Sequence, residues 1–253
     1  MSRDRGNSIG MDVSQPVVVL AVMGLPGTGK STLCGEVGKQ LKREPVGPYS
    51  ESIIVYEEVP HEELALFLST KADPETGYNK AAMGLQLAFL RLRETSLAKA
   101  MRRAIASDRP TLIVEDRGMA GDAAMALGVL GGGAMSASEY ASYSSELRGS
   151  MRRLHAEFGQ FPYVLVNLRM GSPAEALARC HKRGSAGESV YDETYFRNLS
   201  VSHDRVVLDP PSFVTLAVHE DWARERPVDT DADRAALPVR AVIARALCGV
   251  ACV

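Results

Sequence analysis

The chain has 253 residues, of which 45% are hydrophobic and 24% charged, and its formal net charge is −2 at pH 7. These values are typical of a globular protein with one large core, and they give no electrostatic basis for binding nucleic acid or a membrane surface. No apolar stretch reaches the ~20 residues that a membrane-spanning helix needs. The cysteines at positions 34, 180, 248 and 252 lack metal-ligand spacing, so they predict free thiols in a reducing compartment, the cytoplasm.

The order of strands and helices predicts an α/β fold. Residues 1–15 are polar and predict a disordered leader, and residues 16–253 predict a single domain. Apolar and β-branched runs predict strands at 16–24, 52–58, 110–118, 162–170 and 213–221. Helical spacing predicts helices at 31–42, 80–107, 136–158, 172–184 and 231–250, with another helical stretch before the glycine run at 131–133. Strands that alternate with helix-length segments predict a doubly wound parallel sheet of five strands, flanked by helices.

The stretch GLPGTGKST, residues 24–32, follows the first predicted strand and matches the phosphate-loop pattern G-x-x-x-x-G-K-[ST]. Its glycines let successive backbone N–H groups point at phosphate oxygens, and the following helix adds its positive end. Lys30 is expected to supply a charge for the β- and γ-phosphates, and the Ser31 hydroxyl can coordinate Mg²⁺. The residues predicted to bind ATP here are Gly24, Gly27, Thr28, Gly29, Lys30, Ser31 and Thr32.

Acidic residues end two further predicted strands, where an open α/β sheet places its ligand site. Glu57 and Glu58 end the second strand, and either carboxylate could accept a proton from an attacking hydroxyl. Asp116 ends the third strand and is expected at the metal ion, with Arg117 after it. An arginine in that place disfavours a motor ATPase, in which a second acid is usual, and favours a group that holds a substrate or a phosphoryl group.

Two arginines predict a mobile lid over about 179–190. Arg179 and Arg183 lie four residues apart, so they share one helical face, and a glycine- and serine-containing stretch and Glu188 follow them. Such an arrangement suits a segment that closes over a transferring phosphoryl group. A basic helix end exposed to solvent would give the same pattern.

In order and spacing, these motifs resemble the deoxynucleoside kinase family over most of residues 17–222. The resemblance implies that Glu57 is the general base on a 5′-hydroxyl, with Glu58 as the alternative because it stands where the family has proline. It implies that Lys30 and Arg117 act on the transferring phosphoryl group, that Arg179 and Arg183 are lid arginines, and that Ser31 and Asp116 hold Mg²⁺. A third lid arginine of the family is Ser185 here.

The resemblance also implies how the acceptor is bound. Gln86 matches the glutamine that pairs with the base, and Glu188 matches the residue that binds the sugar 3′-hydroxyl. Arg93 and Asp122 stand where the branch that phosphorylates deoxycytidine and purine deoxynucleosides carries a base-reading pair. The expected function is therefore ATP-dependent 5′-phosphorylation of one of these deoxynucleosides by a homodimeric enzyme.

Two other functions stay open at the level of sequence. A nucleoside monophosphate kinase of the thymidylate type shares the Asp-Arg strand end and an arginine lid, but it should carry further arginines for the phosphate of its acceptor. A P-loop regulator without enzymatic activity is a more distant alternative, since the sequence has no N-K-x-D motif of the GTPases.

Overall fold

The computed structural model describes residues 17–56, 58–184, 191–220 and 244. The predicted leader and, apart from residue 244, the predicted closing helix at 231–250 lie outside the described residues. Within them Cys34 and Cys180 are free thiols, as the sequence predicts, and burial raises the pKa of Cys34. No helix in the described part of the chain is long and apolar enough to cross a membrane.

The described elements alternate along the chain much as predicted. The strands are β1 (Val17–Met23), β2 (Glu51–Val55), β3 (Thr111–Asp116), β4 (Tyr163–Leu168) and β5 (Leu216–Glu220). The helices are α1 (Lys30–Arg43), α2 (His61–Ser69), α3 (Ala82–Ala106), α4 (Gly118–Gly131), α5 (Ala137–Phe158), α6 (Pro173–Arg183) and α7 (Glu193–Leu208). The strands form one sheet in the order β2-β3-β1-β4-β5, and every pairing is parallel, which confirms the predicted five-stranded doubly wound sheet.

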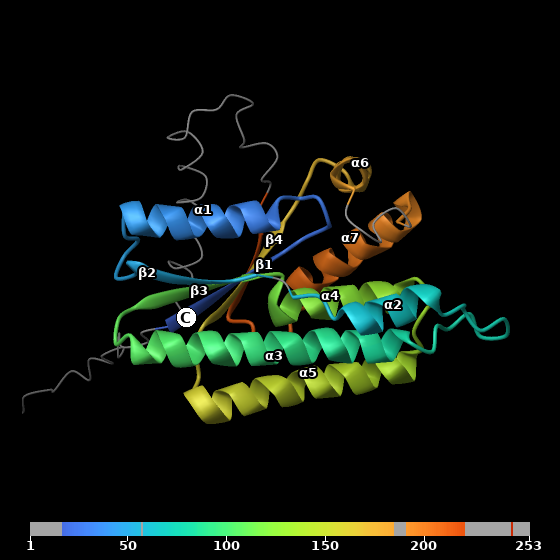
Figure 1. Cartoon of the computed structure of the whole chain (residues 1–253), viewed down its shortest axis with the longest axis horizontal. Coiled ribbons are helices and arrows are strands. Elements are labelled where there is room, and N and C mark those ends of the chain that lie inside the picture. The colour runs from blue at the N-terminus through green and yellow to red at the C-terminus, as the bar shows by residue number, and fades with distance from the viewer. Residues whose placement is uncertain (1–16, 57, 185–190, 221–243, 245–253) are drawn as a thin grey trace, which may run out of the picture.

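The side-chain alternation of the central strand β1 divides the core into two layers. Val18, Leu20 and Val22 point to the face that α1 covers. Val19 and Ala21 point to the opposite face, where α3, α4 and α5 pack. Figure 1 shows this arrangement, with α1 above the sheet and α3, α4 and α5 below it. β1 is therefore buried on both faces, which explains its unbroken run of apolar residues.

Two helices were not predicted from the sequence. Helix α2 has no buried residue, so it shows little of the amphipathic spacing that marks a helix. Helix α7 buries the polar residues Ser202 and His203 beside Phe196, Leu199 and Val206, and this mixture hides its apolar stripe. The start of α6 is as predicted, because the Ser172 side chain accepts a hydrogen bond from the Glu175 backbone N–H at 3.2 Å and Pro173 follows.

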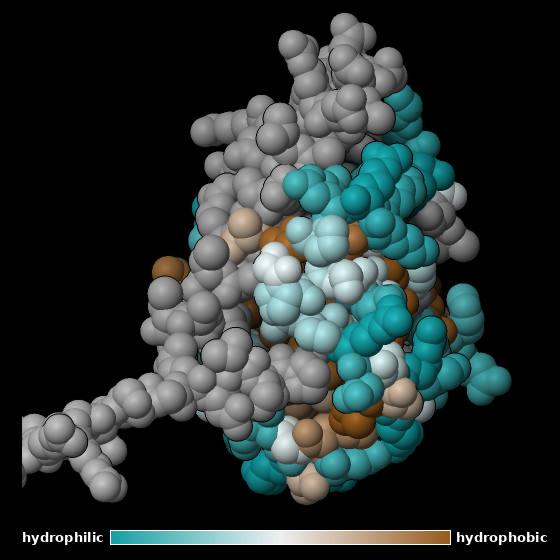
Figure 2. Space-filling model, turned by 90° about the vertical axis from the view of Figure 1, so that its left-hand side faces the viewer, coloured by the Kyte–Doolittle hydropathy of each residue, from teal (hydrophilic) through white to brown (hydrophobic). Residues whose placement is uncertain are grey.

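Hydrophilic residues cover most of the described surface on the face shown in Figure 2, where hydrophobic side chains emerge at scattered points. The carboxyl ends of the strands are at the right in Figure 1, where the loop between β1 and α1 turns and where α6 lies nearby. The predicted phosphate-binding loop and the residues that follow β3 lie at that edge.

Candidate active site

One carbonyl oxygen accepts several hydrogen bonds within the loop between β1 and α1. The Leu25 oxygen accepts hydrogen bonds from the Thr28 backbone N–H at 3.3 Å, from the Thr28 hydroxyl at 2.9 Å and from the Lys30 ammonium at 3.0 Å. The Leu25 side chain packs with residues of α6 and α7. Both the carbonyl group and the side chain of Leu25 therefore hold the loop in place at the start of α1.

Ser31 and Asp116 meet at the base of this loop. The Ser31 hydroxyl donates to Oδ2 of Asp116, and Oδ1 of Asp116 is buried with no hydrogen-bond partner among the described residues. A hydroxyl beside a carboxylate with a spare buried oxygen suits the hard oxygen ligands of Mg²⁺. In the described part of the chain, no group of three or more His, Cys, Asp or Glu side chains is arranged so that it could hold a metal ion. The residues thus fit a Mg²⁺ ion that takes its remaining ligands from phosphate and water, rather than an all-protein metal site.

Arg117 follows Asp116 directly and stands at the entry of α4. It is buried, with 8% of its surface exposed. Its backbone N–H donates a hydrogen bond to the Val22 oxygen at 2.8 Å, so the pairing of β3 with β1 continues for one residue beyond the end of β3. The positive charge of Arg117 opposes the burial that raises the pKa of Tyr195 on α7. Arg117 thus follows β3 at the edge of the sheet that carries the phosphate loop.

Helix α6 packs closely on the phosphate loop. A Cβ atom at Gly27, whose φ is +82°, would be 2.6 Å from the Ala176 oxygen and 3.3 Å from Cβ of Arg179. Arg179 is exposed and pairs with Glu175 at 3.0 Å, and Arg183 is exposed in the last turn. The two arginines are thus on a helix that touches the loop, while residues 185–190, and Glu188 with them, lie outside the described residues.

A second polar group lies on the inner side of α3 and α4. Arg93 and Asp122 are 3% and 2% exposed, and Arg93 Nε is 3.3 Å from Asp122 Oδ2. Gln86 precedes Arg93 by two helical turns on the same face of α3, and its carbonyl oxygen is buried with no hydrogen-bond partner among the described residues. Buried polar groups normally have partners, so this oxygen is an acceptor suited to a ligand.

Glu115 and Tyr163 form a buried pair beside that group. The Tyr163 hydroxyl donates to Glu115 Oε2 at 2.8 Å and accepts from the Met119 backbone N–H at 3.0 Å. Burial raises the pKa of Glu115 to about 7, while the Tyr163 hydrogen bond and the charge of Arg93 act in the opposite direction and Asp122 adds to the increase. Tyr163 thus does more than pack in the core, because its hydroxyl links Glu115 to the start of α4.

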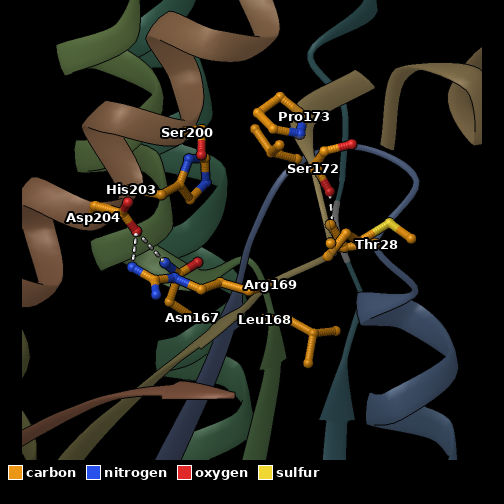
Figure 3. A pocket seen from close by; sticks show the side chains of 12 residues that line it. Thr28, Asn167, Leu168, Arg169, Ser172, Pro173, Ser200, His203 and Asp204 are labelled. Atoms are coloured by element: carbon orange, nitrogen blue, oxygen red, sulfur yellow. Dashed lines mark hydrogen bonds and ion pairs between the residues drawn. The ribbon is translucent and has the colours of Figure 1, made fainter. Parts of the chain in front are cut away.

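A polar cavity of about 360 Å³ opens between the phosphate loop, the end of β4 and α7. Figure 3 shows His203 and Asp204 projecting from α7, with Arg169 paired to Asp204 at 2.7 Å, across from Ser172 and Thr28. The Leu199 carbonyl can only accept, so Nδ1 of His203, 2.7 Å away, carries the proton. Burial, with the charges of Lys30 and Arg117, lowers the pKa of His203 to about 3, and the ring is therefore neutral at pH 7.

The expected general base cannot be placed, since Glu57 lies outside the described residues. Its neighbour Glu58 is exposed and accepts a hydrogen bond from the Ser96 hydroxyl of α3 at 3.0 Å. Glu58 is thus directed toward the side of α3. The choice between the two glutamates stays a prediction.

Sequence reasoning gave no role to Glu115, His203 or Leu25. A signal for Glu115 was present, because neighbouring residues of a strand point to opposite faces and Asp116 was already assigned to the phosphate side. A glutamate on the other face of a buried strand needs a polar partner, and Tyr163 supplies one. No comparable signal existed for His203, whose position depends on how α7 packs.

No protein-family model matches the sequence, and no curated protein sequence matches it significantly. Solved structures do match. Deoxyadenosine kinase from M. mycoides with bound dATP aligns with a TM-score of 0.60 and 18% identity, over 89% of this chain and 97% of that one. The same kinase with bound dCTP gives a TM-score of 0.56 at 19% identity, over 89% and 99% of the two chains. With the products dCMP and a flexible dCDP bound, that kinase aligns with a TM-score of 0.53 at 18% identity, over 91% of this chain and 98% of that one. This likeness shows that the chain shares the fold of these kinases.

Proposed function

We propose that the protein transfers the γ-phosphoryl group of ATP to the 5′-hydroxyl of a deoxynucleoside. The observation that carries the proposal is the segment 116–122, which joins two different polar sites. Its first residue, Asp116, meets Ser31 at the phosphate loop, and its last, Asp122, forms a buried pair with Arg93 of α3. The proposed binding groups for the triphosphate and for the uncharged acceptor thus lie at the two ends of one short segment, which carries Arg117 between them.

The donor half suits phosphoryl transfer by positioning and charge stabilisation. The loop N–H groups and Lys30 would hold the β- and γ-phosphates, and Arg117 would contact the moving phosphoryl group. A Mg²⁺ ion at Ser31 and Asp116 would supply charge neutralisation on the phosphate oxygens. Arg179 and Arg183 would approach from α6, which already touches the loop at Gly27.

The acceptor half suits a base with adjacent donors and acceptors. Gln86 offers a carbonyl oxygen together with an amide N–H, and the Arg93–Asp122 pair adds fixed donors and acceptors. In the reaction the 5′-oxygen forms a bond to phosphorus, the bond to the bridging oxygen of ADP breaks, and Glu57 takes the hydroxyl proton. Glu188 would bind the 3′-hydroxyl.

Deoxycytidine or a purine deoxynucleoside is the proposed acceptor, because an Arg–Asp pair that hydrogen-bonds the base discriminates against bases that leave its groups unpaired. The structural neighbours support the class of ligand, since the kinase from M. mycoides is described with dATP, dCTP and dCMP. A homodimer in the cytoplasm stays part of the proposal.

The activity is tested with radiolabelled ATP and Mg²⁺ against the four deoxynucleosides and, separately, their 5′-monophosphates. We expect labelled monophosphates from deoxycytidine and the purine deoxynucleosides and little labelled diphosphate from any monophosphate. Labelling of monophosphates alone would favour the thymidylate-type alternative. Binding of ATP without transfer to any acceptor would favour the regulator.

The base site is tested by replacing Arg93 with Met and Asp122 with Asn, singly and together. Because the pair acts as one unit, each single change should cost nearly as much kcat/KM as the double change. Lys99→Met, on the exposed side of the same helix, is the matched control. Unchanged ratios among the four deoxynucleosides would remove the pair from base selection.

A further inference from the structure

Arg117 has a backbone conformation that its own residue type disfavours. Its φ is +82° and its ψ is −56°, a region that is costly for a residue with a Cβ atom. Such a conformation persists only where the surrounding structure holds it in place. The groups around Arg117 should therefore reveal what holds it.

Tyr163 holds the chain directly after Arg117. Helix α4 begins at Gly118 and has no side-chain hydrogen bond from its N-cap residue, which is Arg117 itself. Tyr163 of β4 caps the helix instead, because its hydroxyl accepts a hydrogen bond from the Met119 backbone N–H at 3.0 Å. Its donor bond to Glu115 at 2.8 Å fixes the hydroxyl, and the Phe213 ring, edge-on at 5.3 Å, fixes the tyrosine ring.

Two glycines make the space that this arrangement needs. At Gly118, with φ of +60°, a Cβ atom would be 2.7 Å from the Tyr163 hydroxyl and 2.8 Å from Glu115 Oε2. At Gly121 a Cβ atom would be 2.6 Å from Cγ of Arg117 and 3.2 Å from Cβ of Met23. The stem of the Arg117 side chain therefore lies across the first turn of α4, in space that only glycine leaves open.

We propose that Tyr163 is a positioning residue for Arg117, with Glu115 orienting its hydroxyl and Gly121 providing the path of the side chain. The inference rests on the proposed function, in which Arg117 contacts the transferring phosphoryl group. Tyr163 touches neither substrate, and it acts by fixing the start of α4. Misplacing a catalytic group by about 1 Å costs on the order of 100-fold in rate, so the loss of this support should appear in kcat.

The test compares Tyr163→Phe with Tyr49→Phe. Tyr49 is 8% exposed and belongs to the apolar layer on the other face of the sheet, so the control removes a tyrosine hydroxyl far from Arg117. We expect Tyr163→Phe to lower kcat by tenfold or more, roughly, with KM for ATP and for the nucleoside changed less than about threefold. Tyr49→Phe should keep the wild-type kcat. A Tyr163→Phe enzyme with lower melting temperature and full kcat would overturn the proposal.

Two further variants separate positioning from folding. Gly121→Ala places a methyl group against Cγ of Arg117 and Cβ of Met23, so it should displace Arg117 and lower kcat, and its melting temperature measures any destabilisation separately. Glu115→Gln keeps an acceptor for the Tyr163 hydroxyl, so it should lose less kcat than Glu115→Ala. Full kcat in Gly121→Ala, or equal losses in the two Glu115 variants, would contradict the proposal.

A measurement that needs no turnover distinguishes failure of this inference from failure of the proposed function. The ¹⁵Nε–Hε resonance of Arg117 should be a single sharp signal in the wild type and in Tyr49→Phe, and shifted or broadened in Tyr163→Phe. That result supports the positioning role even if the wild type phosphorylates no nucleoside, in which case only the function fails. An Arg117 resonance identical in all three proteins overturns the positioning role.

Discussion

Glu115 and Asp116 are neighbours in the chain, yet the alternation of β3 directs their carboxyl groups to opposite faces of the sheet. Asp116 meets Ser31 on the phosphate side, and Glu115 meets Tyr163 on the side that α3, α4 and α5 cover. Two acidic residues in sequence thus have different environments and different expected roles. Replacing each of the two carboxylates with its neutral amide should therefore cause a different defect.

Replacing Asp116 with Asn should raise the Mg²⁺ concentration needed for half-maximal activity and lower kcat roughly 100-fold. The reason is that an amide oxygen binds a divalent cation more weakly than a carboxylate, and the ion supplies several kcal/mol of charge stabilisation. Asp108→Asn, the same chemical change at an exposed turn residue, is the control. A Mg²⁺ titration of Asp116→Asn that matches the wild type would remove Asp116 from the metal site.

The buried His203 should make the protein less stable in mild acid. Its pKa is lowered from 6.5 to about 3, chiefly by burial, so between these values the unfolded chain binds a proton that the folded chain does not. Stability is therefore fully present above about pH 6.5 and is lost as the pH falls, by about 2 kcal/mol at pH 5 relative to His203→Gln.

Urea denaturation of both proteins from pH 5 to 8 measures this difference. The difference in free energy of unfolding between the wild type and His203→Gln should be constant above pH 7 and should change below about pH 6.5. His61→Gln, at an exposed position on α2, is the control and should not diverge from the wild type. A pH-independent difference between the wild type and His203→Gln would contradict a neutral buried imidazole.

At the scale of the elements, α6 and the phosphate loop behave as one packed unit through Gly27, Leu25 and Ala176. Gly27→Ala should therefore abolish tight ATP binding, because its Cβ atom meets the Ala176 oxygen at 2.6 Å. Gly47→Ala is a matched control, since Gly47 also has positive φ, +58°, but has no atom within 4 Å of the added carbon. Backbone strain should cost each variant about 1 kcal/mol of stability, and Gly27→Ala should lose more because its added carbon meets the Ala176 oxygen.

Calorimetric titration with ATP and Mg²⁺ separates the two glycine variants. Gly47→Ala should bind as the wild type does, because its strain is far from the loop. Equal ATP affinity in Gly27→Ala and Gly47→Ala would show that the loop and α6 are not coupled through this contact.

The elements that could be predicted from the sequence are those whose burial gives a clear pattern. β1 is apolar throughout because helices cover both its faces, and α6 starts where Ser172 and Pro173 indicate. Helix α7 was missed because it buries His203 and Ser202 among its apolar residues. The phosphate loop follows from local sequence alone, whereas the Tyr163–Met119 contact joins residues far apart in the chain and arises only from packing.

At the scale of the whole molecule, the parallel sheet brings the ends of β1, β3 and β4 to one edge. The phosphate loop follows β1, Arg117 follows β3, and Asn167 and Arg169 stand at the end of β4, where they face α7 (Figure 3). The buried Arg93–Asp122 pair lies between α3 and α4 on the lower layer of Figure 1. In the proposed function, this edge of the fold would hold the triphosphate and the layer beneath it would hold the uncharged acceptor.

The most direct test of this account is ³¹P NMR of the full-length protein with ATP, Mg²⁺ and a mixture of deoxycytidine, deoxyadenosine and deoxyguanosine. We predict phosphomonoester resonances coupled to two 5′ protons, growing as ADP appears, and none when the corresponding 5′-deoxy analogues are used. ADP accompanied only by inorganic phosphate, or no consumption of ATP at all, would contradict a deoxynucleoside kinase.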